Sequence, residues 1–147
     1  MPKVLIVEDE LIVADMVEEM LNAHGYEVCG IARTVAEAVS LARDHKPDLA
    51  VIDLRLADGE LGTEVAAQLR GANGPGVLYT SGNTAQIILT AADGHACLSK
   101  PYHGSELIRG LEIVADITAT GRATPPFPHK FQVLAAVNAG PGTSCHG

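Results

Sequence analysis

Five short apolar segments recur along this chain, and four of them end in a polar or charged group where the apolar residues stop. The first segment ends in Glu8 and Asp9, the third in Asp53, the fourth in Ser81 and the fifth in Lys100. The first, third and fourth segments are apolar almost throughout, which is typical of parallel strands covered by helices on both faces. Because the carboxyl ends of parallel strands share one edge of a sheet, we expect these polar side chains to converge there.

Helical patterns separate these segments and follow the last one. Apolar residues recur at helical spacing from Ile12 to Leu21, and Thr34 with Glu37 three residues later is a capping-box pattern for a second helix. A third helix follows the loop after the third segment, and we expect a fourth over 84–92 and a fifth over 105–120. Alternating strands and helices with right-handed connections predict an α/β fold, a doubly wound parallel sheet. We expect five strands in the flavodoxin-like order 2-1-3-4-5, together with five helices.

The chain has 147 residues, enough for one domain with a buried core. We place that domain at 1–121 and a tail rich in proline and glycine at 122–147. The tail shows little periodicity, and the short helical piece that we expect in it spans 131–137. Its apolar residues favour docking on the domain or association of two copies over free disorder.

Composition excludes several classes of function. The net charge is −8 and the 10 lysines and arginines form no basic stripe, which argues against nucleic acid as a partner. No apolar stretch has the length of a membrane span, and the first residues lack the pattern of a signal peptide. Cys29, Cys97 and Cys145 are widely spaced, and a reducing compartment suits them better than a disulfide framework or a zinc site. We therefore expect a cytoplasmic protein that binds neither nucleic acid nor membrane.

The converging polar groups predict a metal-assisted phosphoryl-transfer site. Carboxylates brought together repel one another unless a cation lies between them, and oxygen ligands suit Mg²⁺. We predict that Glu8, Asp9 and Asp53 hold Mg²⁺, with the backbone carbonyl of Arg55 completing the coordination. Asp53, alone at the end of the central strand, is the predicted phosphoacceptor. Lys100 supplies the counter-charge that phosphoryl transfer needs.

Together and in this order, the motifs resemble the receiver domain of bacterial two-component response regulators, over roughly residues 3–120. The motifs that carry the resemblance are Val-Leu-Ile-Val-Glu-Asp-Glu at 4–10, Pro-Asp-Leu-Ala-Val-Ile-Asp-Leu at 47–54, Tyr-Thr-Ser-Gly at 79–82 and Lys-Pro-Tyr at 100–102. The resemblance implies Mg²⁺-dependent transfer of a phosphoryl group to Asp53 from a sensor histidine kinase or a histidine phosphotransfer protein. It also implies slow self-catalysed hydrolysis afterwards, and no activity as an enzyme on other substrates.

The same resemblance implies a conformational switch, from which this chain departs. In the family, phosphorylation draws the residue matching Ser81 towards the phosphate, and an aromatic residue on the fifth strand turns inward. Thr80 is the alternative for the hydroxyl role, and we prefer Ser81 because the small residue of the family pattern, Gly82, follows it directly. The aromatic position here holds Cys97, which lacks the necessary bulk, and the expected fourth helix is about one turn short.

Two functional readings stay open from the sequence. The first is a stand-alone receiver that signals by contact with a downstream protein, with a homodimer through the face of the fourth helix, fifth strand and fifth helix, or through the tail, as one arrangement. The second is a pseudo-receiver, a binding module that works without phosphorylation. A phosphohydrolase of the haloacid dehalogenase type is disfavoured, because that class needs a second aspartate where this chain has Arg55.

Overall fold

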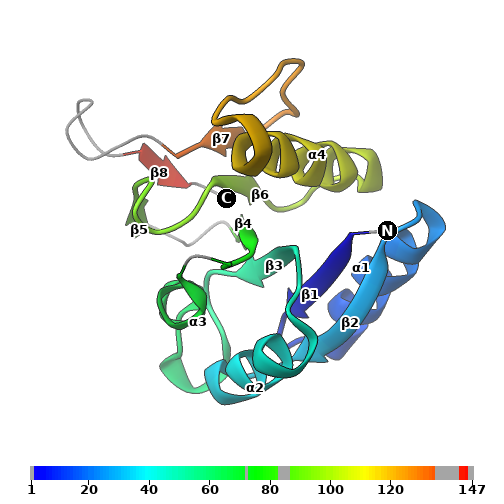
Figure 1. Cartoon of the computed structure of the whole chain (residues 1–147), viewed down its shortest axis with the longest axis vertical. Helices are drawn as coiled ribbons and strands as arrows, with labels where there is room; N and C mark the ends of the chain where they lie inside the picture. Colours follow the sequence, from blue (N-terminus) through cyan, green and yellow to red (C-terminus); the bar gives the residue numbers. More distant parts are fainter. Residues whose placement is uncertain (1, 72, 83–86, 135–142, 146–147) are drawn as a thin grey trace.

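The computed structural model describes residues 2–71, 73–82, 87–134 and 143–145, which form one α/β domain (Figure 1). Its main sheet has six strands in the order β2-β1-β3-β4-β6-β7. The first five are parallel to one another, and β7 runs antiparallel to β6. The strands are β1 (Lys3–Val7), β2 (Glu27–Ala32), β3 (Leu49–Asp53), β4 (Gly76–Ser81), β6 (Ala96–Ser99) and β7 (Phe131–Val133). The predicted doubly wound sheet and its strand order are therefore confirmed.

Helices cover the sheet on both faces. The α-helices of the described residues are α1 (Leu11–Ala23), α2 (Val35–His45), α3 (Gly62–Leu69) and α4 (Gly104–Thr120). The start of α2 follows the predicted capping pattern. The Thr34 hydroxyl accepts from the Glu37 amide at 3.1 Å, and the Glu37 carboxylate accepts from the Arg33 amide at 2.8 Å. The first contact satisfies an amide of the first helical turn, and the second satisfies the amide of the residue before the N-cap.

The core has two layers, one on each face of the sheet. Alternate residues of a strand point to opposite faces, so Leu5 and Val7 of β1 join the layer under α2 and α3. Val4 and Ile6 of the same strand join the layer under α1 and α4. Burial of β1 and β3 on both faces explains why their sequences are almost continuously apolar. It also fixes the ends of these strands, from which the polar side chains project.

The predicted fourth helix, 84–92, is wrong where the structure describes it. Residues 84–86 lie outside the described residues, and Ile87–Leu89 form a short strand, β5, that pairs antiparallel with β8 (Thr143–Cys145). A turn follows, in which the Thr90 amide donates to the Asp93 carboxylate at 2.8 Å. Two adjacent isoleucines favour the extended conformation, because β-branched side chains lose rotamer freedom in a helix. The described part of the chain thus has four α-helices where we expected five.

The helical piece predicted at 131–137 is also wrong in its described part. Phe131–Val133 form β7, whose residues Phe131, Gln132 and Val133 pair with Leu98, Cys97 and Ala96 of β6. Residues 135–137 lie outside the described residues. By pairing with β6, residues 131–133 satisfy their own backbone groups and those on the edge of β6. A short isolated helix would be only marginally stable and would leave that edge unpaired. Figure 1 shows β7 beside β6, close to α4.

Two expectations drawn from composition have different outcomes. Cys97 is disulfide-bonded, whereas Cys29 is free, so the expectation that all three cysteines stay reduced is corrected. Among the described helices, none has the length and apolar character needed to cross a bilayer.

Candidate functional site

Charged side chains from the ends of three parallel strands meet at one edge of the sheet. Glu8 and Asp9 follow β1, Asp53 ends β3 and Lys100 follows β6. One carboxylate oxygen from each of Glu8, Asp9 and Asp53 lies within 4.8 Å of the others. The Lys100 ammonium is 3.4 Å from Glu8 Oε1 and 3.3 Å from Asp53 Oδ2. The structure therefore brings together the charged residues that the sequence analysis singled out.

Burial gives this cluster unusual electrostatics. Glu8 is 4% exposed and Asp53 8% exposed. Burial, followed by the hydrogen bond and charge of Asp53, raises the pKa of Glu8 to about 8, and the nearby Lys100 opposes this only in part. Burial alone would lower the pKa of Lys100, but the charges of Asp53 and Glu8 outweigh it and raise that pKa above its ordinary value. Among the described residues the Lys100 ammonium pairs with two carboxylates, so its single positive charge does not balance them when both are ionised.

The donor set fits a hard divalent cation. Within the described part of the chain, Glu8 Oε2 is buried without a hydrogen-bond partner. A buried carboxylate oxygen without a partner is costly, and a bound cation would satisfy it. Carboxylate oxygens at this separation are the ligands that Mg²⁺ prefers. The predicted ligand role of the Arg55 carbonyl stays a prediction, while the Arg55 amide donates to Asp53 Oδ1 at 3.3 Å.

Gly62, at the end of the loop that follows Asp53, packs directly against the backbone of Asp53. Gly62 begins α3, and its amide donates to the Leu54 carbonyl at 2.8 Å. A Cβ at Gly62 would overlap the backbone carbonyl of Asp53 and lie 2.7 Å from Ile52 Cγ2. Only glycine lets α3 start this close to Asp53, the predicted phosphoacceptor. The signal in the sequence was a glycine at the end of the loop that follows Asp53.

Two hydroxyl-bearing residues end β4 beside this cluster. Thr80 is the register partner of Asp53 on the neighbouring strand, and Ser81 follows it. Both residues are buried, and the Ser81 hydroxyl donates to the Gly82 carbonyl at 3.2 Å. The Ser81 carbonyl accepts from the Lys100 amide at 2.7 Å, which ties the end of β4 to the start of the lysine loop. The preference for Ser81 over Thr80 in the hydroxyl role stays a prediction.

The residue at the usual aromatic switch position is enclosed. Cys97 lies in the middle of β6, is 0% exposed and pairs with Gln132 of β7. An inward swing of a large side chain, the motion that the family resemblance implies, has no equivalent at this residue. β7 occupies the outer edge of the strand that carries it.

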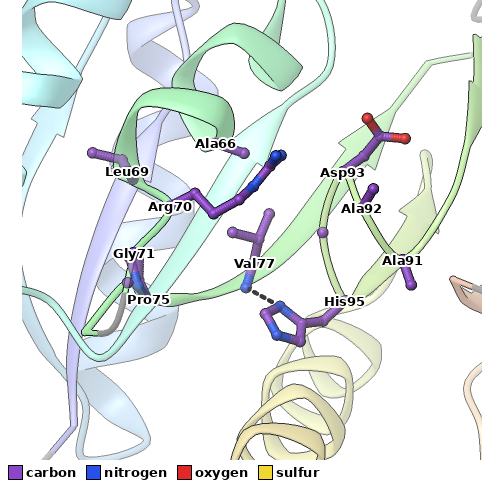
Figure 2. Close-up of a pocket in the computed structure, with 12 residues that line it drawn as sticks. Ala66, Leu69, Arg70, Gly71, Pro75, Val77, Ala91, Ala92, Asp93 and His95 are labelled. Atoms are coloured by element: carbon purple, nitrogen blue, oxygen red, sulfur yellow. Dashed lines mark hydrogen bonds between the residues drawn. The ribbon is translucent and has the colours of Figure 1, made fainter. Parts of the chain in front are cut away.

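A separate hollow of about 420 Å³ lies at the opposite, amino-terminal end of β4 (Figure 2). At its base the Val77 amide donates to His95 Nδ1 at 2.9 Å, and burial lowers the pKa of His95. Arg70 and Asp93 contribute charged groups to its walls. None of the predicted site residues lines this hollow, so it is distinct from the carboxylate cluster.

Comparison with known families and proteins agrees with this geometry. A model of the response regulator receiver domain matches residues 4–112. The transcriptional regulatory protein PdtaR of Mycobacterium tuberculosis is 35% identical over 114 residues, which cover 76% of this chain and 55% of that protein. The polar-differentiation response regulator DivK of Brucella anthropi is 39% identical over 71 residues, which cover 48% of this chain and 56% of that protein. The chain spans about half the length of the curated relatives it matches.

Solved structures show the same fold. The signal receiver domain of a modulated diguanylate cyclase from Desulfovibrio desulfuricans, described as an example of alternate folding, is 29% identical with a TM-score of 0.69. The match covers 83% of this chain and 99% of that domain. The anti-anti-sigma factor PhyR from Bartonella quintana is also 29% identical, with a TM-score of 0.66, and covers 82% of this chain and 49% of that one.

Proposed function

Because this chain belongs to the response regulator receiver domain family of two-component systems, we propose that it accepts a phosphoryl group on Asp53 in a Mg²⁺-dependent reaction. The observation that carries the proposal is the cluster of Glu8, Asp9 and Asp53 with Lys100 in contact with two of its carboxylates. In this proposal the protein catalyses only its own phosphorylation and dephosphorylation. Its expected compartment is the cytoplasm.

The proposed reaction is a displacement at phosphorus. A carboxylate oxygen of Asp53 attacks the phosphoryl group of a phosphohistidine, the phosphorus–nitrogen bond breaks, and the departing imidazole takes up a proton. Mg²⁺, when bound, would neutralise negative charge on the transferring group. Lys100, already 3.3 Å from Asp53 Oδ2, is positioned to bind a phosphoryl oxygen. Hydrolysis by water then releases inorganic phosphate and restores the Asp53 carboxylate.

The phosphohistidine donor would dock beside this edge of the sheet. The first turns of α1, which begins just after the carboxylate pair, expose the apolar side chains of Leu11, Ile12 and Met16 by 49%, 78% and 61%. Neighbouring exposed apolar side chains mark a contact surface for another protein. A sensor histidine kinase or a histidine phosphotransfer protein that covers this patch would bring its phosphohistidine to Asp53.

Intact mass spectrometry tests the proposal directly. The full chain is incubated with a small phosphoryl donor, with and without Mg²⁺, next to Asp53→Asn, which keeps the side chain's size and removes its charge. We expect the mass of one phosphoryl group to be added only to the parent chain and only with Mg²⁺. A folded parent chain that gains no mass from this donor or from a phosphorylated histidine phosphotransfer protein would favour the pseudo-receiver alternative.

A further inference from the structure

The described part of the tail, residues 122–134, is a strap that runs from the end of α4 back along the edge of β6 (Figure 1). Arg109, on α4, holds its first half. The guanidinium donates to the Pro126 carbonyl at 3.0 Å and to the Thr124 carbonyl at 2.5 Å, and it also pairs with Glu112 at 3.3 Å. A charged group that binds two carbonyls of an otherwise irregular segment fixes the path of that segment.

Apolar contacts hold the second half of the strap on both faces of the sheet. The rings of Phe127 and Phe131 stack with centroids 6.1 Å apart. Phe131 packs against the layer of α1 and α4, where a Cβ at Gly110 would lie 3.3 Å from its ring. Leu134 is 6% exposed and belongs to the opposite layer. Phe127 and Val133 stay 49% and 37% exposed, so the strap is docked without being wholly buried.

Backbone pairing places the strap on hydrogen-bonding groups that β6 would otherwise expose. The Ser99 amide donates to the Lys130 carbonyl at 3.1 Å, and the Leu134 amide donates to the His95 carbonyl at 3.0 Å. Lys130 adopts a left-handed backbone with φ 58°, which is strained for a residue with a side chain. The pairing is therefore maintained against a local conformational cost, which makes it easier to release.

The same pairing reaches the carboxylate cluster through one peptide unit. Ser99, bound to the strap, precedes Lys100, whose ammonium contacts Asp53 and Glu8. The Lys100 amide donates to the Ser81 carbonyl, so strands β4 and β6 and the strap meet at this point. A phosphoryl group on Asp53 would offer Lys100 new acceptors in place of its present contacts with Asp53 and Glu8. The hydrogen bond between the Ser99 amide and the Lys130 carbonyl is the one made by the unphosphorylated chain.

We propose that the strap is a releasable cover: phosphorylation of Asp53 weakens its pairing with β6, and the exposed edge binds an extended strand of a partner protein. This inference rests on the proposed function. The partner's chemistry follows from the present occupant, which is itself an extended segment held by backbone hydrogen bonds and aromatic side chains. Addition of a strand to an open sheet edge is a common mode of recognition between proteins, and open edges without such a cover invite pairing.

Hydrogen exchange of the full chain tests the coupling. Peptides covering β6 and the strap are followed by mass spectrometry with and without the small phosphoryl donor and Mg²⁺, while intact mass reports the adduct. A reductant is present throughout because Cys97 is disulfide-bonded. We expect phosphorylation to speed exchange in these peptides by about tenfold, and Asp53→Asn to show no change. An adduct with unchanged or slower exchange overturns the inference alone, whereas the absence of any adduct overturns the proposed function and this coupling with it.

Substitution of Arg109, the residue that holds the first half of the strap, tests whether the strap can be released without phosphorylation. Arg109→Ala removes the charged donor from two carbonyls, so we expect about tenfold faster exchange in the strap without phosphorylation. The matched control is Arg122→Ala, because Arg122 is exposed and its guanidinium makes no hydrogen bond or ion pair with the described residues. If Arg109→Ala melts at a clearly lower temperature, Arg109→Gln, which keeps most of the side chain and removes its charge, replaces it.

Binding of a separate peptide tests whether the edge of β6 accepts an added strand. The probe is a fluorescent peptide with the sequence of residues 127–134, which contains β7. We expect it to bind Arg109→Ala and the phosphorylated parent at least about tenfold more tightly than the unphosphorylated parent. Faster exchange of the strap in Arg109→Ala without any binding of the peptide would overturn the role of β6 as a docking edge.

Discussion

The Lys100 ammonium lies 3.3 Å from Asp53 Oδ2, although β4 separates the two strands that carry these residues. The contact therefore spans the carboxyl end of β4, which lies between β3 and β6. It is partly exposed, with 26% of the Lys100 side chain and 11% of the Asp53 side chain accessible. An ion pair in this setting neutralises charge that develops near Asp53 more effectively than one in open water.

Replacement of Lys100 by methionine keeps the length of the side chain and removes its charge. We expect phosphorylation of Asp53 to slow by about 100-fold, because the variant loses the counter-charge for the transferring group. We expect the free energy of unfolding to fall as well, by about 1–2 kcal/mol, because the buried Asp53 then loses its ion-pair partner. Rates come from intact-mass time courses. Lys46→Met, at an exposed position, is the control, and an equal slowing in that variant would contradict the assignment.

The two hydroxyls at the end of β4 are distinguished by substitutions of matched size. Ser81→Ala removes the predicted phosphoryl contact, and we expect it to slow formation of the adduct by about tenfold. Thr80→Val keeps the branched shape and removes only the other hydroxyl, so we expect less than a twofold effect. The measurement is the initial rate at saturating Mg²⁺. If the ranking is reversed, the hydroxyl role belongs to Thr80.

The close packing of Gly62 against Asp53 predicts that a side chain at position 62 destabilises the fold. In Gly62→Ala the added methyl group meets the Asp53 carbonyl and Ile52, so the loop that follows Asp53 must shift. We expect a loss of about 1–3 kcal/mol in the free energy of unfolding, measured by urea denaturation. Gly71→Ala is the control, because a Cβ there meets nothing within 4 Å and no left-handed backbone is involved. Comparable losses in the two variants would refute the close contact.

The raised pKa of Glu8 predicts an unusual pH dependence of the metal-free chain. Its pKa of about 8 lies above the ordinary value of 4.5, so the folded state binds more protons than the unfolded state between these values. This contribution to stability is complete below about pH 4.5 and is lost as the pH rises towards 8. With a chelator present to remove metal ions, we expect the melting temperature of Glu8→Gln to fall less than that of the parent chain as the pH rises over this range. An identical decline in the variant would exclude Glu8 as its source.

Mg²⁺ and a proton compete for the same carboxylate in this scheme. We therefore expect the apparent Mg²⁺ affinity of the parent chain to rise between pH 6 and about pH 8, the pKa of Glu8, as its proton becomes easier to displace. Calorimetric titration at several pH values measures this rise, and Glu8→Gln should show a weaker affinity with less dependence on pH.

Much of this site was visible in the sequence because its signals are local. The apolar segments before Glu8, Asp53 and Ser81 are short and buried on both faces, which identifies them as parallel strands. Once the strands are parallel, the edge at which their last residues meet follows from topology alone. The convergence of Asp53 and Lys100 could therefore be predicted without any contact being known, and the strand order and family were confirmed.

The tertiary structure decided what depends on long-range pairing. Residues 87–89 and 131–133 became strands, against the helical expectation, because partner strands were available to them in the folded chain. The clamp of Arg109 on the strap and the approach of Gly62 to Asp53 likewise join segments whose contact no local pattern encodes. Periodicity and capping report the preferences of a segment by itself. Which edge of a sheet remains free, and which segment fills it, is determined only when the whole chain competes for the same hydrogen-bonding groups.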